Sequence, residues 1–205
     1  AKKLGTSVYF PTHAIPMLPE ALSNGLCSLR PGVIRLTLTC EMHLNQEGEC
    51  IDFRIYESLI KSHARLDYDA VADFLDSGKN SISNKEILKS LKLMQELMHL
   101  LEEKRKRRGA IQFEFSESSV VFDHQNRMTG MSKKFQSSSM KMIEQFMLEA
   151  NETVARHCVK RKLPALYSVH QPPSDFKLQQ LKKTRAHSGV NPKTVSLSDS
   201  YGFSR

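Results

Sequence analysis

The sequence of 205 residues lacks any apolar run long enough to cross a membrane, and no signal-peptide pattern opens it. Cysteine is also scarce. The four cysteines are widely separated and form no C-x-x-C pair, which argues against a zinc site and a disulfide framework; they are Cys27, Cys40, Cys50 and Cys158. We therefore expect a cytoplasmic protein with no membrane partner, and we predict no oligomer.

Familiar catalytic motifs are missing as well. The sequence has no G-x-x-x-x-G-K-[ST] phosphate loop, no G-x-G-x-x-G, no H-E-x-x-H and no G-x-S-x-G. His63 and His170 stand out among the scattered histidines, although a lone histidine in a packed segment is usually structural. Asp67, Asp69 and Asp73 are close in sequence, but a two-metal site needs acidic groups that converge on ions about 4 Å apart. Since Asp67 precedes a predicted helix, an N-cap is the favoured interpretation.

Positive charge is what the sequence has in excess, with 30 Lys and Arg against 22 Asp and Glu and a formal net charge of +8. A basic balance favours a polyanionic partner, nucleic acid above all. The densest basic feature is a run of five residues: Lys104, Arg105, Lys106, Arg107 and Arg108. This run could contact RNA phosphates, or it could be the solvated end of a helix, and the sequence leaves both interpretations open.

Hydrophobic periodicity predicts an α+β fold in which antiparallel hairpins pack with helices. Strict alternation over 33–44 and again over 51–56 predicts two strands that form a hairpin. A second hairpin is expected from 111–115 and 120–122, with its turn at 116–119. The segment 5–32 is rich in turn-forming residues and in apolar ones, so we expect an ordered loop that packs onto the core.

Three helices are predicted by capping signals and apolar stripes. The first begins after Asp67, the second follows a capping box at 83–86, and the third follows the serines at 137–139. The second helix has its stripe at Ile87, Leu91, Met94, Met98 and Leu101. The stripe expected for the third helix is Ile143, Met147, Ala150, Val154 and His157 or Cys158.

These elements predict one partial domain over residues 1–205. Its expected parts are an ordered loop segment (1–32), hairpins and helices (33–130), a helical part (131–193) and a polar end (194–205). Four aromatic residues could stack on RNA bases, although each is more often a core residue: Tyr9, Phe10, Phe113 and Phe115.

A set of short strings occurs in one order along nearly the whole chain. They are G-T-S-V-Y-F-P (5–11), I-P-M-L-P-E (15–20), L-S-N-G-L-C-S-L (22–29), S-H-A-R-L (62–66), R-G-A-I (108–111), I-E (143–144), A-N (150–151) and P-A-L-Y (164–167). This set resembles the catalytic (RNB) domain of the ribonuclease II/ribonuclease R family, with bacterial ribonuclease R the nearest likeness. The resemblance implies a 3′→5′ exoribonuclease, a hydrolase that degrades single-stranded RNA with Mg²⁺.

The resemblance also implies roles for individual residues. Tyr9 matches a tyrosine that stacks near the 3′-terminal nucleotide, Phe113 matches an aromatic residue that clamps the terminal bases from the other side, and Glu144 matches a glutamate close to the terminal nucleotide. Phe115 lies two positions from Phe113 on the same face of the expected strand, so the assignment there is loose. Stacking is indifferent to base identity and would suit sequence-tolerant degradation.

Two family motifs are not found in this sequence. The acidic metal motif D-x-x-x-x-x-D-x-D-D is expected shortly before Gly5, and T-S-P-I-R-[RK]-Y is expected after residue 205. We therefore expect a fragment that binds RNA at Tyr9, Phe113 and Glu144, holds no metal of its own, does not cleave RNA alone, and is poorly soluble or partly folded. The alternatives are a non-catalytic RNA-binding remnant and a protein-interaction module that uses the helix at 84–108.

Overall fold

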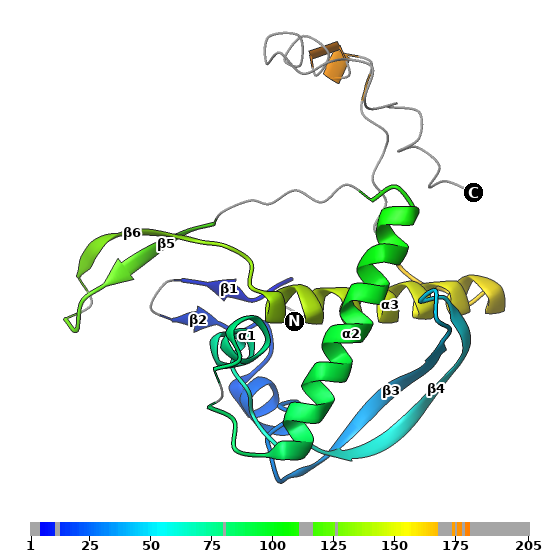
Figure 1. The fold of residues 1–205 in the computed structure, drawn as a ribbon, viewed down its shortest axis with the longest axis horizontal. Helices are drawn as coiled ribbons and strands as arrows, with labels where there is room; N and C mark the ends of the chain where they lie inside the picture. Colours follow the sequence, from blue (N-terminus) through cyan, green and yellow to red (C-terminus); the bar gives the residue numbers. More distant parts are fainter. Residues whose placement is uncertain are drawn as a thin grey trace.

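The computed structural model describes residues 5–10, 13–79, 81–110, 117–125 and 127–167, together with 174, 176–177 and 179–180. Helices and two-stranded antiparallel ribbons build this part of the chain (Figure 1), which confirms the predicted α+β class. The elements are β1 (Val8–Tyr9), β2 (Ala14–Ile15), the π-helical turn η1 (Ala21–Leu26), β3 (Ile34–Leu44), β4 (Cys50–Lys61), α1 (Tyr68–Ser77), α2 (Lys85–Arg107), β5 (Glu117–Phe122), β6 (Met128–Lys134) and α3 (Ser138–Arg161). None of the helices in the described ranges is long and apolar enough to cross a membrane.

The hydrophobic core lies where α1, α2 and α3 meet. Its buried residues are Val71, Ile82, Leu91, Met98 and Met142, with Phe74, Leu75, Ile87, Leu88, Met94 and Phe146 packed against them. Four members of the predicted α2 stripe belong to this cluster or pack on it, and the fifth, Leu101, is buried outside it. The α2 prediction is therefore confirmed, because a stripe at helical spacing needs an apolar surface to cover it.

Side-chain caps begin all three long helices. Asp67 accepts a hydrogen bond from the backbone N–H of Ala70 at 2.8 Å at the start of α1. Asn84 accepts from the N–H groups of Glu86 and Ile87 at the start of α2. The cap therefore lies one residue after Ser83, the position that the predicted capping box assigns to it. Ser137 does the same for α3. The N-cap interpretation of Asp67 is thus confirmed, and its carboxylate satisfies a backbone N–H that the helix leaves unpaired.

The β3–β4 ribbon is the longest in the described structure. Its strands pair from Ile34 opposite Lys61 to Leu44 opposite Cys50. The predicted hairpin is confirmed, although β4 extends to Lys61 rather than ending at residue 56. The turn packs on α2: Gly48 adopts a φ of +77°, and a Cβ there would lie 3.3 Å from Leu100. One face of the ribbon stays uncovered near its open end, where Leu36 is 86% exposed and Leu38 75%.

Three sequence-based expectations are wrong. The second hairpin does not turn at 116–119, because Ser118 and Ser119 pair with Lys133 and Ser132 within β5–β6. Its turn begins at Asp123, whose Oδ1 accepts hydrogen bonds from the N–H groups of residues 125 and 127. Sequence periodicity did not predict β6, because most of its residues are polar or small and show no apolar alternation. The expected strand at 111–115 lies outside the described residues.

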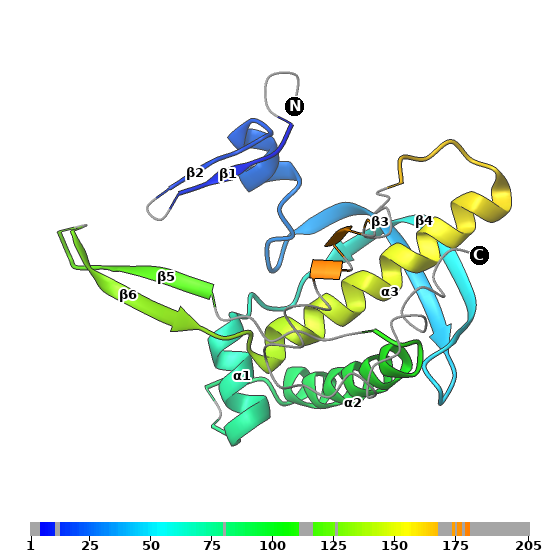
Figure 2. The ribbon, with the colours of Figure 1, turned by 90° about the horizontal axis from the view of Figure 1, so that it is seen from above.

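The second error concerns the segment 5–32, which does not pack onto the core. Seven of its large apolar side chains are exposed: Val8, Tyr9, Phe10, Ile15, Leu22, Leu26 and Leu29. It forms instead the small β1–β2 ribbon and η1. In Figure 2 this ribbon lies well apart from α1, α2 and α3.

The third error is the face of α3. Of the predicted stripe, Ile143, Met147 and Val154 are exposed, whereas the buried positions are mostly polar: Ser139, Met142, Gln145, Glu149 and Thr153. Gln145 and Glu149 pair with α2, as described below. Ser139 donates to the Tyr68 carbonyl of α1, and Thr153 accepts a hydrogen bond from Arg156. The helical part also begins later than residue 131, since β6 extends to Lys134.

Candidate functional site

Tyr9 lies on β1 of the two-stranded β1–β2 ribbon, where it pairs with Ala14. Its side chain is 81% exposed. The next residue, Phe10, stacks on His13 with the ring centroids 4.9 Å apart. The aromatic face of Tyr9 is therefore accessible for stacking against another flat group, whereas that of Phe10 is partly occupied.

Glu144 lies in the second turn of α3, and each of its carboxylate oxygens has a partner. Gln136 Nε2 donates to Oε2 at 2.6 Å, and Arg105 Nη1 lies 3.8 Å from Oε1. The side chain of Glu144 is still 39% exposed. Because a carboxylate can accept about four hydrogen bonds, Glu144 keeps acceptor capacity for a further partner.

The basic run at the end of α2 has an acceptor inside the chain for each cation. Lys104 donates to Glu149 at 2.8 Å, Arg105 to Gln145 at 3.2 Å, Lys106 to Glu103 at 2.7 Å, Arg107 to the Glu47 carbonyl at 2.5 Å, and Arg108 to both carboxylate oxygens of Glu152 at 2.6 and 2.8 Å. Four of the five cations have partners outside α2: three of them bond to α3 and one bonds to the β3–β4 turn. The run therefore joins α2 to its neighbours, and its contact with RNA stays a prediction.

Lys104 is the most buried member of the run, with 3% of its side chain exposed against 7% for Glu149. Two further charges complete the group, since Glu49 lies 3.6 Å from Lys104 and Arg156 lies 3.4 Å from the other oxygen of Glu149. A buried ion is tolerated only when it is paired and hydrogen-bonded. This requirement explains why Glu149 occupies the buried face of α3.

Arg108 and Glu152 form a second link between the two helices, nearer to solvent. The hydrogen bonds from Arg108 hold the pKa of Glu152 below its ordinary value, even though partial burial opposes this shift. The same hydrogen bonds raise the pKa of Arg108. Both charges are therefore maintained at neutral pH, and the bidentate geometry fixes how α2 crosses α3.

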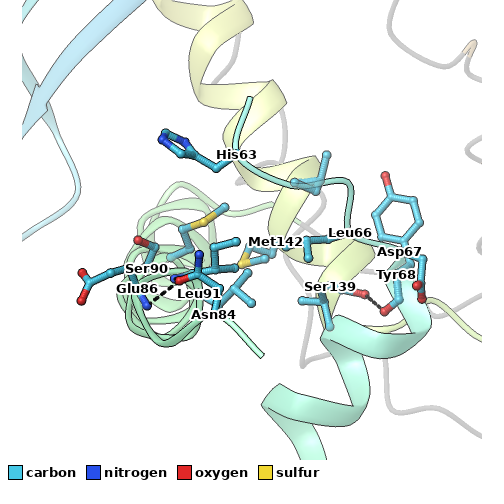
Figure 3. Close-up of a pocket in the computed structure, with 14 residues that line it drawn as sticks. His63, Leu66, Asp67, Tyr68, Asn84, Glu86, Ser90, Leu91, Ser139 and Met142 are labelled. Atoms are coloured by element: carbon cyan, nitrogen blue, oxygen red, sulfur yellow. Dashed lines mark hydrogen bonds between the residues drawn. The ribbon is translucent and has the colours of Figure 1, made fainter. Parts of the chain in front are cut away.

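A cavity of about 410 Å³ lies between α1, α2, α3 and the segment before α1 (Figure 3). Its walls are mainly apolar, and Leu91, Met94 and Met142 contribute to them; His63 lies at its edge. Asp67 also lines the cavity but caps α1. No buried side-chain nitrogen or oxygen in the described part of the chain lacks a hydrogen-bond partner.

We found no metal-binding cluster among the described residues: no three or more His, Cys, Asp or Glu side chains converge. All four cysteine thiols are free. Mg²⁺ binds through oxygen ligands, usually one or two carboxylates together with water and substrate phosphates, and the described residues offer no converging cluster of three such side chains.

The structure brings together only some of the predicted site residues. Arg105 and Glu144 meet, whereas β1, which carries Tyr9, lies apart from α3 in Figure 2. Phe113 and His170 lie outside the described residues. Sequence reasoning missed Gln136 and Gln145, whose amides carry no motif. Glutamates recur along α3 at Glu144, Glu149 and Glu152, and the basic run supplies their partners. This complementary charge was the signal in the sequence that could have revealed the links between α2 and α3.

Comparison with known proteins decides the family. The RNB domain family matches residues 1–201. This chain belongs to the RNB family. It is 42% identical to ribonuclease R 1 of Lactococcus lactis over 181 residues, which are 88% of this chain and 22% of that protein. It is 37% identical to ribonuclease R of Escherichia coli over 191 residues, 93% of this chain and 24% of that protein.

The RNB fold is matched by solved structures too. Mycoplasma genitalium RNase R in complex with ribose-methylated single-stranded RNA superposes with a TM-score of 0.87 at 32% identity, covering 94% of this chain and 30% of that one. The same enzyme in complex with double-stranded RNA gives a TM-score of 0.86 at 33% identity. The chain thus spans about a quarter of the length of its curated relatives.

Proposed function

We propose that this chain supplies part of a 3′→5′ exoribonuclease of the ribonuclease R type, the part that receives the 3′ end of single-stranded RNA. Tyr9 stacks on a terminal base, Glu144 accepts hydrogen bonds near the terminal nucleotide, and Phe113 clamps the bases from the other side. RNA is the substrate and the reaction is metal-dependent hydrolysis in the cytoplasm.

The RNB family match over residues 1–201 carries this proposal. Two features of the described residues support it. Tyr9 offers an exposed aromatic face, and stacking needs no particular base. Glu144 retains exposed acceptor capacity on the solvent side of α3. Mg²⁺ serves the intact enzyme in this proposal, and the residues described here would contribute contacts with RNA only.

The test is binding to two forms of one RNA. A labelled single-stranded RNA of fixed sequence is prepared as a linear molecule with a 3′-hydroxyl and as a closed circle. The chain should bind the linear form about fivefold or more tightly, the lower range of one stacked base. Tyr9→Ala should remove this preference. Equal binding of both forms by the unmodified chain would refute recognition of a 3′ end.

The same linear RNA, labelled at its 5′ end, also tests catalysis. With Mg²⁺ the chain alone should leave the RNA intact, as it should in an EDTA control. Stepwise shortening that EDTA abolishes would show that these residues build a working metal site, contrary to the proposal.

A further inference from the structure

We propose that Arg105 and Gln136 are positioning residues for Glu144, and that they hold its carboxylate in the orientation in which it meets the 3′ end of RNA. This inference rests on the function proposed above. It also reassigns Arg105, which the sequence places among possible contacts to the RNA backbone, to a role inside the protein.

The carboxylate of Glu144 is contacted by side chains from two separate parts of the fold. Gln136, in the segment that leads into α3, donates to Oε2 at 2.6 Å, and Arg105, in the last turn of α2, lies 3.8 Å from Oε1. The hydrogen bond at one oxygen and the ion pair at the other restrain the carboxylate from both sides. A glutamate side chain otherwise has several free rotations, so this restraint decides where its remaining acceptor sites point.

Arg105 is itself restrained by a hydrogen bond to a buried residue of α3. Its Nη1 donates to Gln145 Oε1 at 3.2 Å, and Gln145 is 3% exposed on the buried face of α3. The side chain of Arg105 is only 25% exposed. A guanidinium fixed in this way is preorganised toward the α3 surface rather than toward solvent. Gln145, Arg105 and Glu144 therefore form a chain of contacts that ends at the exposed carboxylate.

A positioning role for Arg105 predicts a different mutational effect from a role as a phosphate contact. An arginine that neutralises a phosphate weakens binding whenever it is removed, and its loss lowers the salt slope of the binding constant by about one. An arginine that acts through Glu144 matters only while Glu144 is present. Its effect is also confined to RNA that has a 3′ end.

The experiment is a double-mutant cycle on the 205-residue chain, read by the affinity for linear and circular single-stranded RNA at several salt concentrations. The variants are Arg105→Met, Gln136→Leu and Glu144→Gln, singly and in pairs with Glu144→Gln. Arg105→Lys tests rescue by a retained charge. Lys106→Met is the matched control, because it removes one positive charge from the same run at a residue that pairs with Glu103.

We expect Arg105→Met and Gln136→Leu each to weaken binding of the linear RNA by about three- to tenfold. Neither should weaken it further when Glu144→Gln is present, and neither should weaken binding of the circle. Arg105→Lys should recover part of the loss, and Lys106→Met should leave the preference for linear RNA unchanged. Thermal unfolding of each variant identifies any loss of folding. Gln136 is exposed before α3, so Gln136→Leu tests the inference even if Arg105→Met unfolds.

Two outcomes overturn the inference and are distinguishable. If the unmodified chain prefers linear RNA but the losses from Arg105→Met and Gln136→Leu persist in the Glu144→Gln background, positioning is refuted and the proposed function stands. A reduced salt slope for Arg105→Met beyond that of Lys106→Met would then identify a phosphate contact. If the unmodified chain shows no preference for linear RNA, the proposed function fails and the inference fails with it.

Discussion

The buried ion pair between Lys104 and Glu149 makes the sharpest stability prediction for this chain. Lys104→Met keeps the length and apolar stem of the side chain but removes the charge that compensates Glu149. Glu149 would remain buried, with 7% of its side chain exposed. Removal of one member of a buried pair leaves an uncompensated charge, which is far more costly than the loss of an exposed pair.

The size of the loss in the free energy of unfolding depends on the charges that remain around Glu149. Breaking a buried ion pair typically costs about 3–5 kcal/mol. Arg156 lies 3.4 Å from Glu149 and still offers part of the compensation, so the loss should lie near the lower end, about 3 kcal/mol. For a domain of this size that loss corresponds to a lower Tm by roughly 6–12 °C.

The assay is urea unfolding followed by far-ultraviolet circular dichroism, with Lys104→Met, Glu149→Gln and the double variant. The double variant should be more stable than the sum of the two single losses predicts, since neither charge is left alone. Lys106→Met is the control, because its partner Glu103 and Lys106 itself are more than half exposed; it should cause no measurable change. Equal stability of Lys104→Met and Lys106→Met would refute the argument from burial.

Three further predictions follow from single contacts. Asp67→Ala should lower the free energy of unfolding by about 1 kcal/mol through loss of the α1 cap, whereas an unchanged urea midpoint would show that the bond from Ala70 contributes nothing. Because Arg108 lowers the pKa of Glu152, this carboxylate stabilises the fold above its unfolded pKa of about 4.3 and the stabilisation is lost as the pH falls through the lower folded value. Glu152→Gln should therefore lower the urea midpoint at pH 7, and this deficit should shrink as the pH falls below about 4.3; a deficit that stays constant over that range would contradict the argument. Tyr9→Ala should weaken binding of linear single-stranded RNA by about fivefold or more with no change in Tm, since Tyr9 is exposed; a lowered Tm would mean that Tyr9 has a structural role.

Much of the fold follows from local signals. The α2 helix was predictable because its cap, its apolar stripe and its basic last turn all agree. The β3–β4 hairpin was predictable because apolar and polar residues alternate on both sides of a turn, and a period of two is typical of paired strands. In β5–β6 the alternation is broken by Gly130 and small polar residues, so the position of the turn could not be read from periodicity.

The candidate site was predictable only in part. Tyr9 and Glu144 came from the resemblance to the RNB family, and the family is confirmed. The partners of Glu144 were not predictable, since Gln136 and Arg105 lie 8 and 39 positions away and in different elements. Glutamine in particular has no pattern that distinguishes a positioning residue from an ordinary surface residue.

By itself the sequence determined the α+β class, the caps, the α2 stripe and the family, because each depends on residues near one another in the chain or on their order along it. The tertiary structure alone decided which face of α3 is buried and what the basic run does. The apolar residues of α3 suggested one face, but the crossing of α2 places Lys104, Arg105 and Arg108 against the other. Charge pairs depend on distance in space, and a buried lysine must lie where its carboxylate lies.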